Sequence, residues 1–154
     1  MEQFEEKIKE YIKKHNLAAE HLSFTVSCHS VEEAAQAVKA SRDDFVKNIC
    51  MIDSQGSLIV AIVKGEDRAS TERVAKALNI ERPRLANPDE ILEKSGFPCG
   101  GTPSFGFNAT FLVDERVMEK DVVFTGGGSQ QSLVKIPTKE LIKANNGKIA
   151  RIRK

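Results

Sequence analysis

The spacing of apolar and polar residues at the start of the chain predicts an amphipathic helix. Phe4, Ile8, Tyr11 and Ile12 fall on one helical face of residues 2–15, and charged side chains occupy most other positions. We therefore expect this helix to cover a core with its apolar face.

The next segments predict a strand followed by a helix. Residues 22–27 alternate apolar and polar side chains, which is typical of a half-buried strand. Ser30 followed by Glu33 has the spacing of a capping box, so we expect a helix over residues 31–40.

Two apolar runs predict a β-hairpin. Residues 46–53 and 58–64 have the composition of strands, and the short polar segment 54–57 joins them. The second run is almost entirely apolar, which indicates a central strand covered on both faces.

The second half of the chain continues with short elements. Residues 70–78 predict a helix, and Asn87 followed by Pro88 predicts the start of another helix, which Gly96 ends. Shorter apolar runs predict strands at residues 110–114, 122–125 and 133–136.

A last helix is predicted to begin with Thr138 as its cap and to end at Gly147. Helices and strands thus alternate irregularly and include a hairpin. This order predicts an α+β class with a mixed sheet rather than a doubly wound parallel sheet. Because the chain shows no repeat, linker or low-complexity segment, we expect residues 1–154 to form one domain.

The charge balance limits the kind of partner that the chain can bind. Its 154 residues contain 23 Lys and Arg against 22 Asp and Glu, a net charge of +1. Residues 148–154 hold four of the basic residues and no acid, so the rest has 19 basic against 22 acidic residues. This basic tail is either a solvated terminus or an arm that binds phosphates. The near-neutral total predicts weak affinity for bulk nucleic acid.

The composition argues against a membrane protein, a secreted protein and a metalloprotein. No apolar run reaches the roughly 18 residues of a membrane helix, and the acidic N-terminus does not resemble a signal peptide. The cysteines are odd in number and form no C-x-x-C pair, which indicates a reducing, cytoplasmic location. Because cysteines and histidines lack the spacing of a zinc site, we expect no metal or cofactor. These residues are Cys28, Cys50, Cys99, His15, His21 and His29.

Two glycine clusters are candidates for a binding site. Residues 97–107 contain three glycines and two prolines, a composition that excludes a regular element. Such a loop either directs backbone N–H groups at a carbonyl or oxyanion, or is a tight connection; its length favours a site. Gly126, Gly127 and Gly128 follow a predicted strand and form either a turn or a nest of amides for an anion.

Two side chains could carry chemistry. Lys47 lies in an otherwise apolar predicted strand, either at a sheet edge or directed into a cleft toward an anion. Cys99 adjoins glycines and could be a nucleophile with His29 as its base, although an inert core cysteine is the simpler interpretation. Cys28 and Cys50 are expected in the core.

In their order along the chain, these segments resemble the YbaK and prolyl-tRNA synthetase-associated editing domains, a family that deacylates mischarged tRNA. The lysine-bearing strand followed by a G-G-x-x-x-F-G loop is the most specific part of the resemblance. The resemblance extends from about residue 22 to residue 143. The matching segments are residues 30–40, 45–49, 58–63, 74–78, 100–106, 111–115 and 126–128.

The resemblance implies a central mixed, partly barrel-like β-sheet flanked by helices. It also implies that Lys47 contacts the 3′-terminal nucleotide of tRNA, and that Gly100, Gly101 and Gly106 hold the aminoacyl carbonyl. The family uses a water assisted by the ribose hydroxyl of the substrate, without a side-chain nucleophile or a metal.

On this basis we predict Lys47, Gly100 and Gly101 as catalytic residues. The predicted substrate-binding residues are Thr102, Pro103, Ser104, Phe105, Gly106, Gly126, Gly127, Gly128, Phe24 and Phe45. Val26 and Val46 are further candidates to line the pocket.

Two departures from the family pattern leave the specificity open. The family loop usually reads G-G-x-S-P-[FL]-G, whereas Pro103 precedes Ser104 here, so a different amide is missing from the loop. The later family turn often carries a basic residue, with an acid on the next strand, whereas residues 129–133 have neither. The edited amino acid therefore does not follow from the relatives.

The leading hypothesis is a free-standing hydrolase that deacylates misacylated tRNA, a reaction called trans-editing. Editing is needed because a pocket separates amino acids differing by one methylene only about 10–200-fold. The expected partners are the acceptor end of aminoacyl-tRNA and an aminoacyl-tRNA synthetase, with no membrane. Two alternatives stay open: an accessory module that binds aminoacyl-tRNA or a nucleotide without turnover, and a hydrolase that depends on Cys99.

Overall fold

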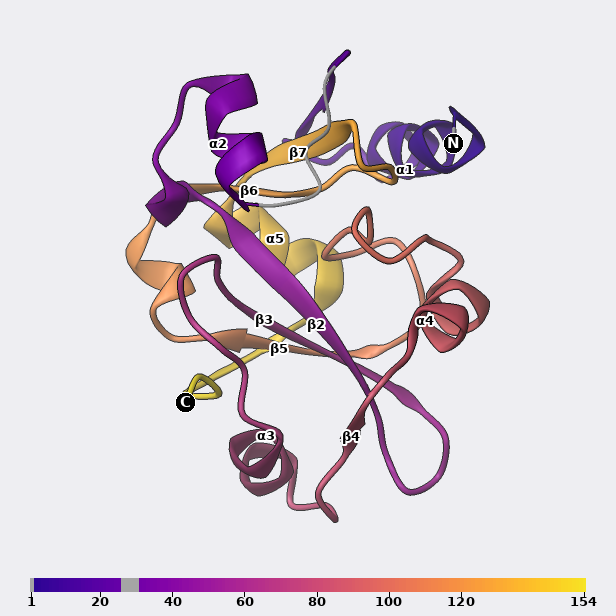
Figure 1. Cartoon of the computed structure of the whole chain (residues 1–154), viewed down its shortest axis with the longest axis vertical. Coiled ribbons are helices and arrows are strands. Elements are labelled where there is room, and N and C mark those ends of the chain that lie inside the picture. Colours follow the sequence, from indigo (N-terminus) through magenta and orange to yellow (C-terminus); the bar gives the residue numbers. More distant parts are fainter. Residues whose placement is uncertain (1, 26–30) are drawn as a thin grey trace.

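The computed structural model describes residues 2–25 and 31–154 of the chain (Figure 1). The predicted cap at Ser30 lies outside the described residues, as do Val26, Cys28 and His29. The described strands divide into two sheets, which helices cover (Figure 1).

The larger sheet is mixed. It contains β2 (Val46–Ile52), β3 (Leu58–Lys64), β4 (Arg84–Leu85), β5 (Thr110–Asp114) and β8 (Lys148–Ala150). Within the described residues their order is β4-β2-β3-β5-β8. The β2–β3 pair is the predicted antiparallel hairpin, whereas β5 runs parallel to β3 and β8 parallel to β5.

The smaller sheet is antiparallel. It contains β1 (Glu20–Ser23), β6 (Val122–Gly126) and β7 (Ser132–Pro137), in the order β1-β7-β6. The two sheets meet where Phe45, just before β2, forms a bridge with Phe124 of β6. Their rings stack with centroids 5.0 Å apart. The predicted α+β class with a mixed sheet is confirmed, and the two sheets do not close into a barrel.

Short helices cover the sheets. They are α1 (Glu2–Lys14), α2 (Val31–Val38), α3 (Thr71–Leu78), α4 (Pro88–Ser95) and α5 (Thr138–Asn145), with 3-10 turns at Arg42–Asp44 and Val117–Glu119. In Figure 1, α1 and α2 lie with the smaller sheet at the upper end, and α3 lies at the opposite end. None of the helices in the described parts of the chain is long and apolar enough to cross a membrane.

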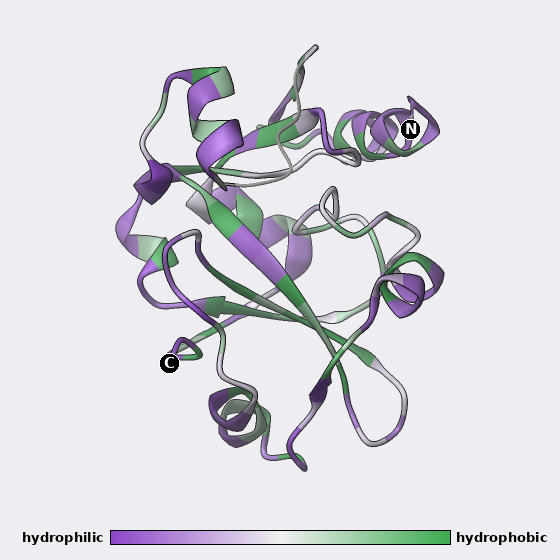
Figure 2. Cartoon of the chain, in the orientation of Figure 1, coloured by the Kyte–Doolittle hydropathy of each residue, from purple (hydrophilic) through white to green (hydrophobic). Residues whose placement is uncertain are grey.

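The core lies on both faces of β3, whose seven residues are all buried. Because alternate residues of a strand point to opposite faces, Val60 and Ile62 join the main cluster, whereas Ile59 and Ala61 pack with Val74 of α3. Figure 2 shows β3 as hydrophobic along its length and α3 as a mixture of hydrophilic and hydrophobic residues. The prediction of a central strand covered on both faces is confirmed.

The bounds of α4 follow the predicted signals. The Asn87 side chain accepts a hydrogen bond from the N–H of Glu90 at 2.9 Å, and the Glu90 carboxylate accepts one from the N–H of Asn87 at 3.0 Å. This capping box starts the helix after Asn87, and Gly96 ends it with a φ of 80°.

The first predicted strand has the wrong bounds. β1 begins at Glu20, before the predicted start at residue 22, and ends at Ser23, because its partner β7 begins at Ser132, opposite Ser23. Residues 26 and 27 of the predicted strand lie outside the described residues. Phe24 lies just beyond the ladder, where its N–H still donates to the carbonyl of Gln131 at 2.7 Å.

The predicted ends of the last helix are also wrong. Pro137 is the N-cap of α5 and Thr138 is its first residue, because the Thr138 hydroxyl donates to the carbonyl of Lys120 at 2.7 Å instead of capping. Asn146 adopts the left-handed conformation that ends the helix, with a φ of 53°, one residue before Gly147.

The basic tail belongs to the folded core, so the interpretation of a solvated terminus is wrong. Its first residues form β8, and Ile152 is fully buried. The buried Asp114 carboxylate accepts hydrogen bonds from the N–H groups of Ile152 and Arg153, at 2.8 and 3.0 Å. It also pairs with the Arg153 guanidinium at 3.1 Å. The tail therefore satisfies a buried charge that would otherwise destabilise the fold.

Candidate functional site

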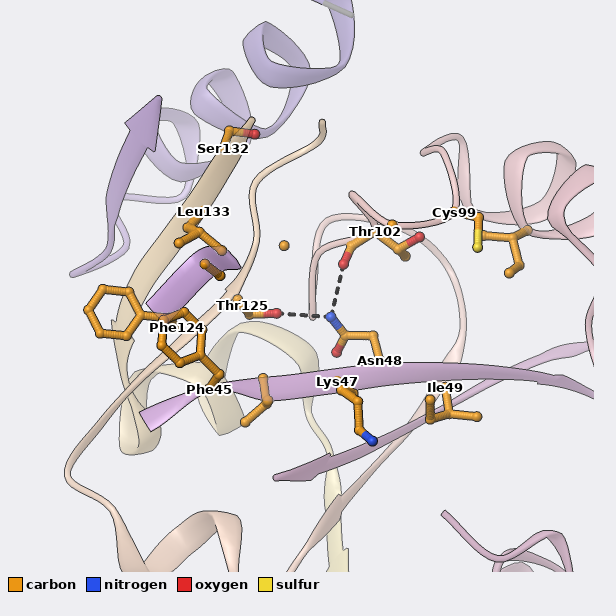
Figure 3. Close-up of a pocket in the computed structure, with 15 residues that line it drawn as sticks. Phe45, Lys47, Asn48, Ile49, Cys99, Thr102, Phe124, Thr125, Ser132 and Leu133 are labelled. Carbon is orange, nitrogen blue, oxygen red and sulfur yellow. Dashed lines mark hydrogen bonds between the residues drawn. The ribbon is translucent and has the colours of Figure 1, made fainter. Parts of the chain in front are cut away.

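A cavity of about 210 Å³ opens between β2, β6, β7 and the glycine-rich loop 97–107 (Figure 3). It brings together the lysine-bearing strand and both glycine segments that the sequence singled out. Its lining residues are Ala34, Phe45, Val46, Lys47, Asn48, Ile49, Ile91, Cys99, Gly100, Thr102, Phe124, Thr125, Gly126, Ser132 and Leu133.

A hydrogen-bond network around Asn48 joins the three walls of the cavity. Asn48 Nδ2 donates to the carbonyl of Thr102 and to Thr125 Oγ1, both at 2.9 Å (Figure 3). Ser104 Oγ donates to Asn48 Oδ1 at 2.6 Å and lies 2.6 Å from Thr125 Oγ1. In Figure 2 a hydrophilic band interrupts the otherwise hydrophobic β2. The network fixes the loop and β6 relative to β2.

Lys47 lies at the rim of the cavity. Its ammonium points to the opposite side of β2 from the Asn48 side chain (Figure 3), as expected for neighbours in a strand. Burial and the nearby Arg68 lower the pKa of Lys47, and Asp67 opposes them. Because Asp67 is itself paired with Arg116 at 2.8 Å, the positive charge at the rim is only partly neutralised.

The glycine loop and the glycine turn pack against each other through their backbones. The N–H of Gly128 donates to the carbonyl of Gly101 at 2.8 Å. A Cβ atom at Gly101 would lie 2.6 Å from the N atom of Ser129, and one at Gly126 would overlap the carbonyl of Thr102. Glycine is required at these two positions because no side chain fits between the segments.

The loop also shows which amides are free for a ligand. The N–H of Gly101 donates to the carbonyl of Pro98 at 3.0 Å, so it is committed inside the loop. Within the described residues, the amides of Gly100 and Thr102 at the cavity have no protein acceptor. The N–H of Cys99, which also lines the cavity, likewise has no protein acceptor among the described residues. Uncommitted N–H groups of this kind can stabilise a carbonyl or an oxyanion.

Helix α1 holds the far side of the glycine turn. The Glu5 carboxylate accepts hydrogen bonds from Ser23 Oγ at 2.6 Å and from Ser129 Oγ at 2.8 Å. His21 Nε2 lies 2.8 Å from the carbonyl of Gly127. Burial opposes ionisation of Glu5, but the bonds from Ser23 and Ser129 outweigh it and hold its pKa below the usual range.

The predicted site residues divide into two groups. Those that line the cavity are Lys47, Gly100, Thr102, Gly126, Phe45 and Val46. Those that do not line the cavity are Gly101, Pro103, Ser104, Gly106, Gly127 and Gly128, which belong to the loop or the turn, and the phenylalanines Phe24 and Phe105.

Phe24 and Phe105 do not line the cavity, contrary to expectation. Phe105 is fully buried in the main core, where its ring centroid lies 5.8 Å from that of Tyr11. Phe24 packs behind the cavity wall, against the cluster that contains Phe45 and Leu133.

Asn48 and Thr125 both line the cavity, but neither was predicted from the sequence. For Asn48 the sequence did contain a signal, since it is a second polar residue, next to Lys47, in the otherwise apolar strand β2. For Thr125 no local signal existed, since a threonine is ordinary in a strand.

The cysteines differ in their accessibility. Cys50 is buried, and burial, together with the nearby Cys99, raises the pKa of its thiol to about 12. Cys99 is exposed and lines the cavity, so it is not the inert core residue of the simpler interpretation. In the described part of the chain, no cluster of three His, Cys, Asp or Glu side chains is placed to hold a metal ion.

Comparison with known protein families shows the family to which the chain belongs. The family model of the aminoacyl-tRNA editing domain matches residues 25–144, which include both glycine segments and the lysine-bearing strand. The chain therefore belongs to the aminoacyl-tRNA editing domain family, and the resemblance to YbaK-like domains is confirmed. Helix α1, β1 and β8 lie outside the matched span.

The chain is similar to both free-standing and fused relatives. The uncharacterized protein YwhH of Bacillus subtilis is 23% identical, over 82% of this chain and 81% of its own length. A proline–tRNA ligase of Pseudothermotoga lettingae is 28% identical over 68% of this chain, which spans only 18% of the ligase. The crystal structure of a candidate trans-editing enzyme for prolyl tRNA synthetase has a TM-score of 0.89 at 24% identity, with 97% of this chain and 96% of that chain covered. The last likeness shows the shared fold.

Proposed function

We propose that this chain hydrolyses the ester bond of misacylated tRNA and so releases a non-cognate amino acid from the acceptor end. The observation that carries the proposal is the cavity itself, in which free loop amides lie across from the Lys47 strand in a chain of the editing-domain family. The match to a segment of a proline–tRNA ligase favours tRNA charged by such a ligase as the substrate.

The terminal nucleotide is proposed to bind at the rim, where Lys47 and Arg68 attract its phosphate. This contact is local, which agrees with a net charge of only +1 over the chain. Hydrogen bonds to the body of the tRNA are not needed, because the ester lies at the extreme end of the tRNA.

The reaction needs orientation more than a strong nucleophile, because an aminoacyl ester is already activated. Water adds to the carbonyl carbon, and the resulting oxyanion accepts hydrogen bonds from the N–H groups of Gly100 and Thr102. The bond to the ribose oxygen then breaks, and that oxygen takes up the proton that the attacking water gives up, so the products are the free amino acid and the tRNA with its ribose hydroxyl restored. One such donor contributes about 3 kcal/mol to lowering the barrier. Gly101, expected to be catalytic, takes a packing role in this scheme.

The first test is a deacylation screen. Purified protein is incubated with tRNAs that carry different small non-cognate amino acids, and loss of the ester is followed over time. We expect hydrolysis of at least one species above the rate in buffer. Stable binding of the same tRNAs without release of amino acid would instead support the accessory-module alternative.

A lysine variant tests the proposed site. Lys47→Ala is expected to lower the deacylation rate about 10²-fold, because the rim loses its charge at the nucleotide. Lys76→Ala is the matched control, since Lys76 is exposed on α3, where its ion-pair partner among the described residues is Glu72 at 3.9 Å. Equal rates in both variants would overturn the role of Lys47, provided that their melting temperatures match that of the wild type.

A further inference from the structure

The network of Asn48, Ser104 and Thr125 has a fixed arrangement of hydrogens. Asn48 Nδ2 faces the carbonyl of Thr102 at 2.9 Å, and a carbonyl can only accept. The amide is therefore not flipped, and its second hydrogen goes to Thr125 Oγ1. With Asn48 Oδ1 as acceptor, the Ser104 hydroxyl must donate to it at 2.6 Å.

The last hydrogen of the network follows from the others. Ser104 and Thr125 lie 2.6 Å apart, and the Ser104 hydrogen is already used. The Thr125 hydroxyl therefore donates to Ser104 Oγ. All donor hydrogens of the three side chains are thus used in these bonds, and only acceptor lone pairs remain on their three oxygens. Ser104 is fully buried and does not line the cavity, so the acceptors at the cavity are Asn48 Oδ1 and Thr125 Oγ1.

The rest of the lining limits what can meet these acceptors. Ser132 is committed to Ser129, with the two hydroxyl oxygens 2.9 Å apart, and most other lining side chains are apolar. Among the described residues that line the cavity there is no carboxylate to balance a cationic ligand, and Lys47 adds positive charge at the rim. At about 210 Å³ the cavity is also smaller than the roughly 300–1,000 Å³ of drug-sized pockets. The amino-acid side chain that fits these acceptors is small and neutral and carries a hydrogen-bond donor, whereas the α-ammonium group is common to all aminoacyl esters and does not distinguish between them.

We propose that the network makes the cavity selective for aminoacyl groups whose side chain carries a hydroxyl. This inference rests on the proposed function and names its substrate class. A hydroxyl donates to the acceptors that the network leaves open, whereas a methyl group of the same size would leave them buried without a partner. That difference corresponds to a preference of about tenfold or more.

Matched substrates separate the hydroxyl from size. Deacylation is measured as kcat/KM on tRNA carrying serine or alanine, and threonine or valine, the second pair being nearly isosteric. We expect serine to exceed alanine, and threonine to exceed valine, by at least about tenfold. Hydrolysis of alanine as fast as serine would overturn the selectivity and leave the deacylase function standing.

Two further measurements test the preference for a hydroxyl separately from the deacylase activity. Thr125→Val removes an acceptor without changing shape, so it is expected to reduce the serine preference, whereas Ser54→Ala in the exposed hairpin turn is expected to keep it. Binding of 3′-serylamido- and 3′-alanylamido-3′-deoxyadenosine reports the preference without hydrolysis. Tighter binding of the seryl compound, in a protein that deacylates nothing, would sustain the selectivity and contradict the proposed function. Equal binding would overturn the selectivity even if Thr125→Val fails to fold.

Discussion

The glycine at position 126 is needed for close packing rather than for an unusual backbone angle. A Cβ atom there would overlap the Thr102 carbonyl, which belongs to the cavity wall. We predict that Gly126→Ala lowers the free energy of unfolding by about 3 kcal/mol, because the packed segments must separate. Urea unfolding measures this loss.

Gly56 provides the control for this prediction. It has a φ of 81°, but no atom lies within 4 Å of a Cβ built on it. Gly56→Ala should therefore cost only about 1–2 kcal/mol, from the backbone conformation alone, and leave deacylation intact. If both variants unfold alike and keep activity, the close packing of loop and turn is not essential.

Cys99 distinguishes the proposed mechanism from the cysteine-dependent alternative. Its thiol is exposed at the cavity, so access alone does not decide the matter. Because we propose water as the nucleophile, Cys99→Ser should keep the wild-type deacylation rate and show no covalent aminoacyl intermediate by mass spectrometry. Loss of activity with a retained fold would restore the alternative.

The predictability of the site differs from residue to residue. Lys47 and Gly100 were recognisable because a charge in an apolar strand and a glycine–proline loop are unusual locally. The network was not, because Asn48 lies 56 residues from Ser104 and 77 from Thr125 in the sequence. Polar residues that find partners only through the fold look like ordinary strand or loop residues beforehand.

Among the helices, α1 supports the site although it lies outside the span that matches the family model. We predict that Glu5→Gln lowers the melting temperature and the deacylation rate, because an amide replaces the charge that accepts from Ser23 and Ser129. The loss in stability is on the order of 1 kcal/mol. Glu6→Gln, on the exposed side of the same helix, is the matched control.

The effect of Glu5 has a defined pH dependence. Its pKa in the folded protein lies below the ordinary 4.5, so the ionised carboxylate stabilises the fold at pH values above 4.5. This contribution is lost as the pH falls through the lowered pKa. Melting curves of Glu5→Gln and wild type should therefore differ at pH 7 and converge as the pH falls progressively below 4.5. A constant difference across this range would contradict the role of the charge.

Element boundaries were predictable where the signal was local. The Asn87 cap and the apolar run of β3 depend on neighbours in sequence, and both were found. β4 and β8 have only two and three residues, so their existence depends on the strands beside them. The same holds for the end of β1, which the start of β7 determines.

For the whole molecule, Asp114 joins the C-terminal segment to the sheet. Burial opposes its ionisation, but bonds from Ile152, Arg116 and Arg153 hold its pKa below the usual range. We predict that Asp114→Ala lowers the free energy of unfolding by about 3 kcal/mol, because it removes the acceptor of the Arg153 guanidinium and of three backbone amides, those of Arg116, Ile152 and Arg153. Glu115→Ala, whose exposed carboxylate lies 3.5 Å from Arg153, is the control and should change little. Equal losses of unfolding free energy in both variants would show that the buried contacts of Asp114 with the tail contribute no more than the exposed Glu115 carboxylate.

The activity that we propose for this protein is hydrolysis of the ester of misacylated tRNA. The most direct measurement uses excess protein over tRNA carrying a labelled, small, non-cognate amino acid, and follows the free label in a single turnover. We expect the wild type to release the label and Lys47→Ala, equally folded, to release it about 10²-fold more slowly. Esters that stay intact throughout the panel, whether or not the tRNA binds, would contradict it.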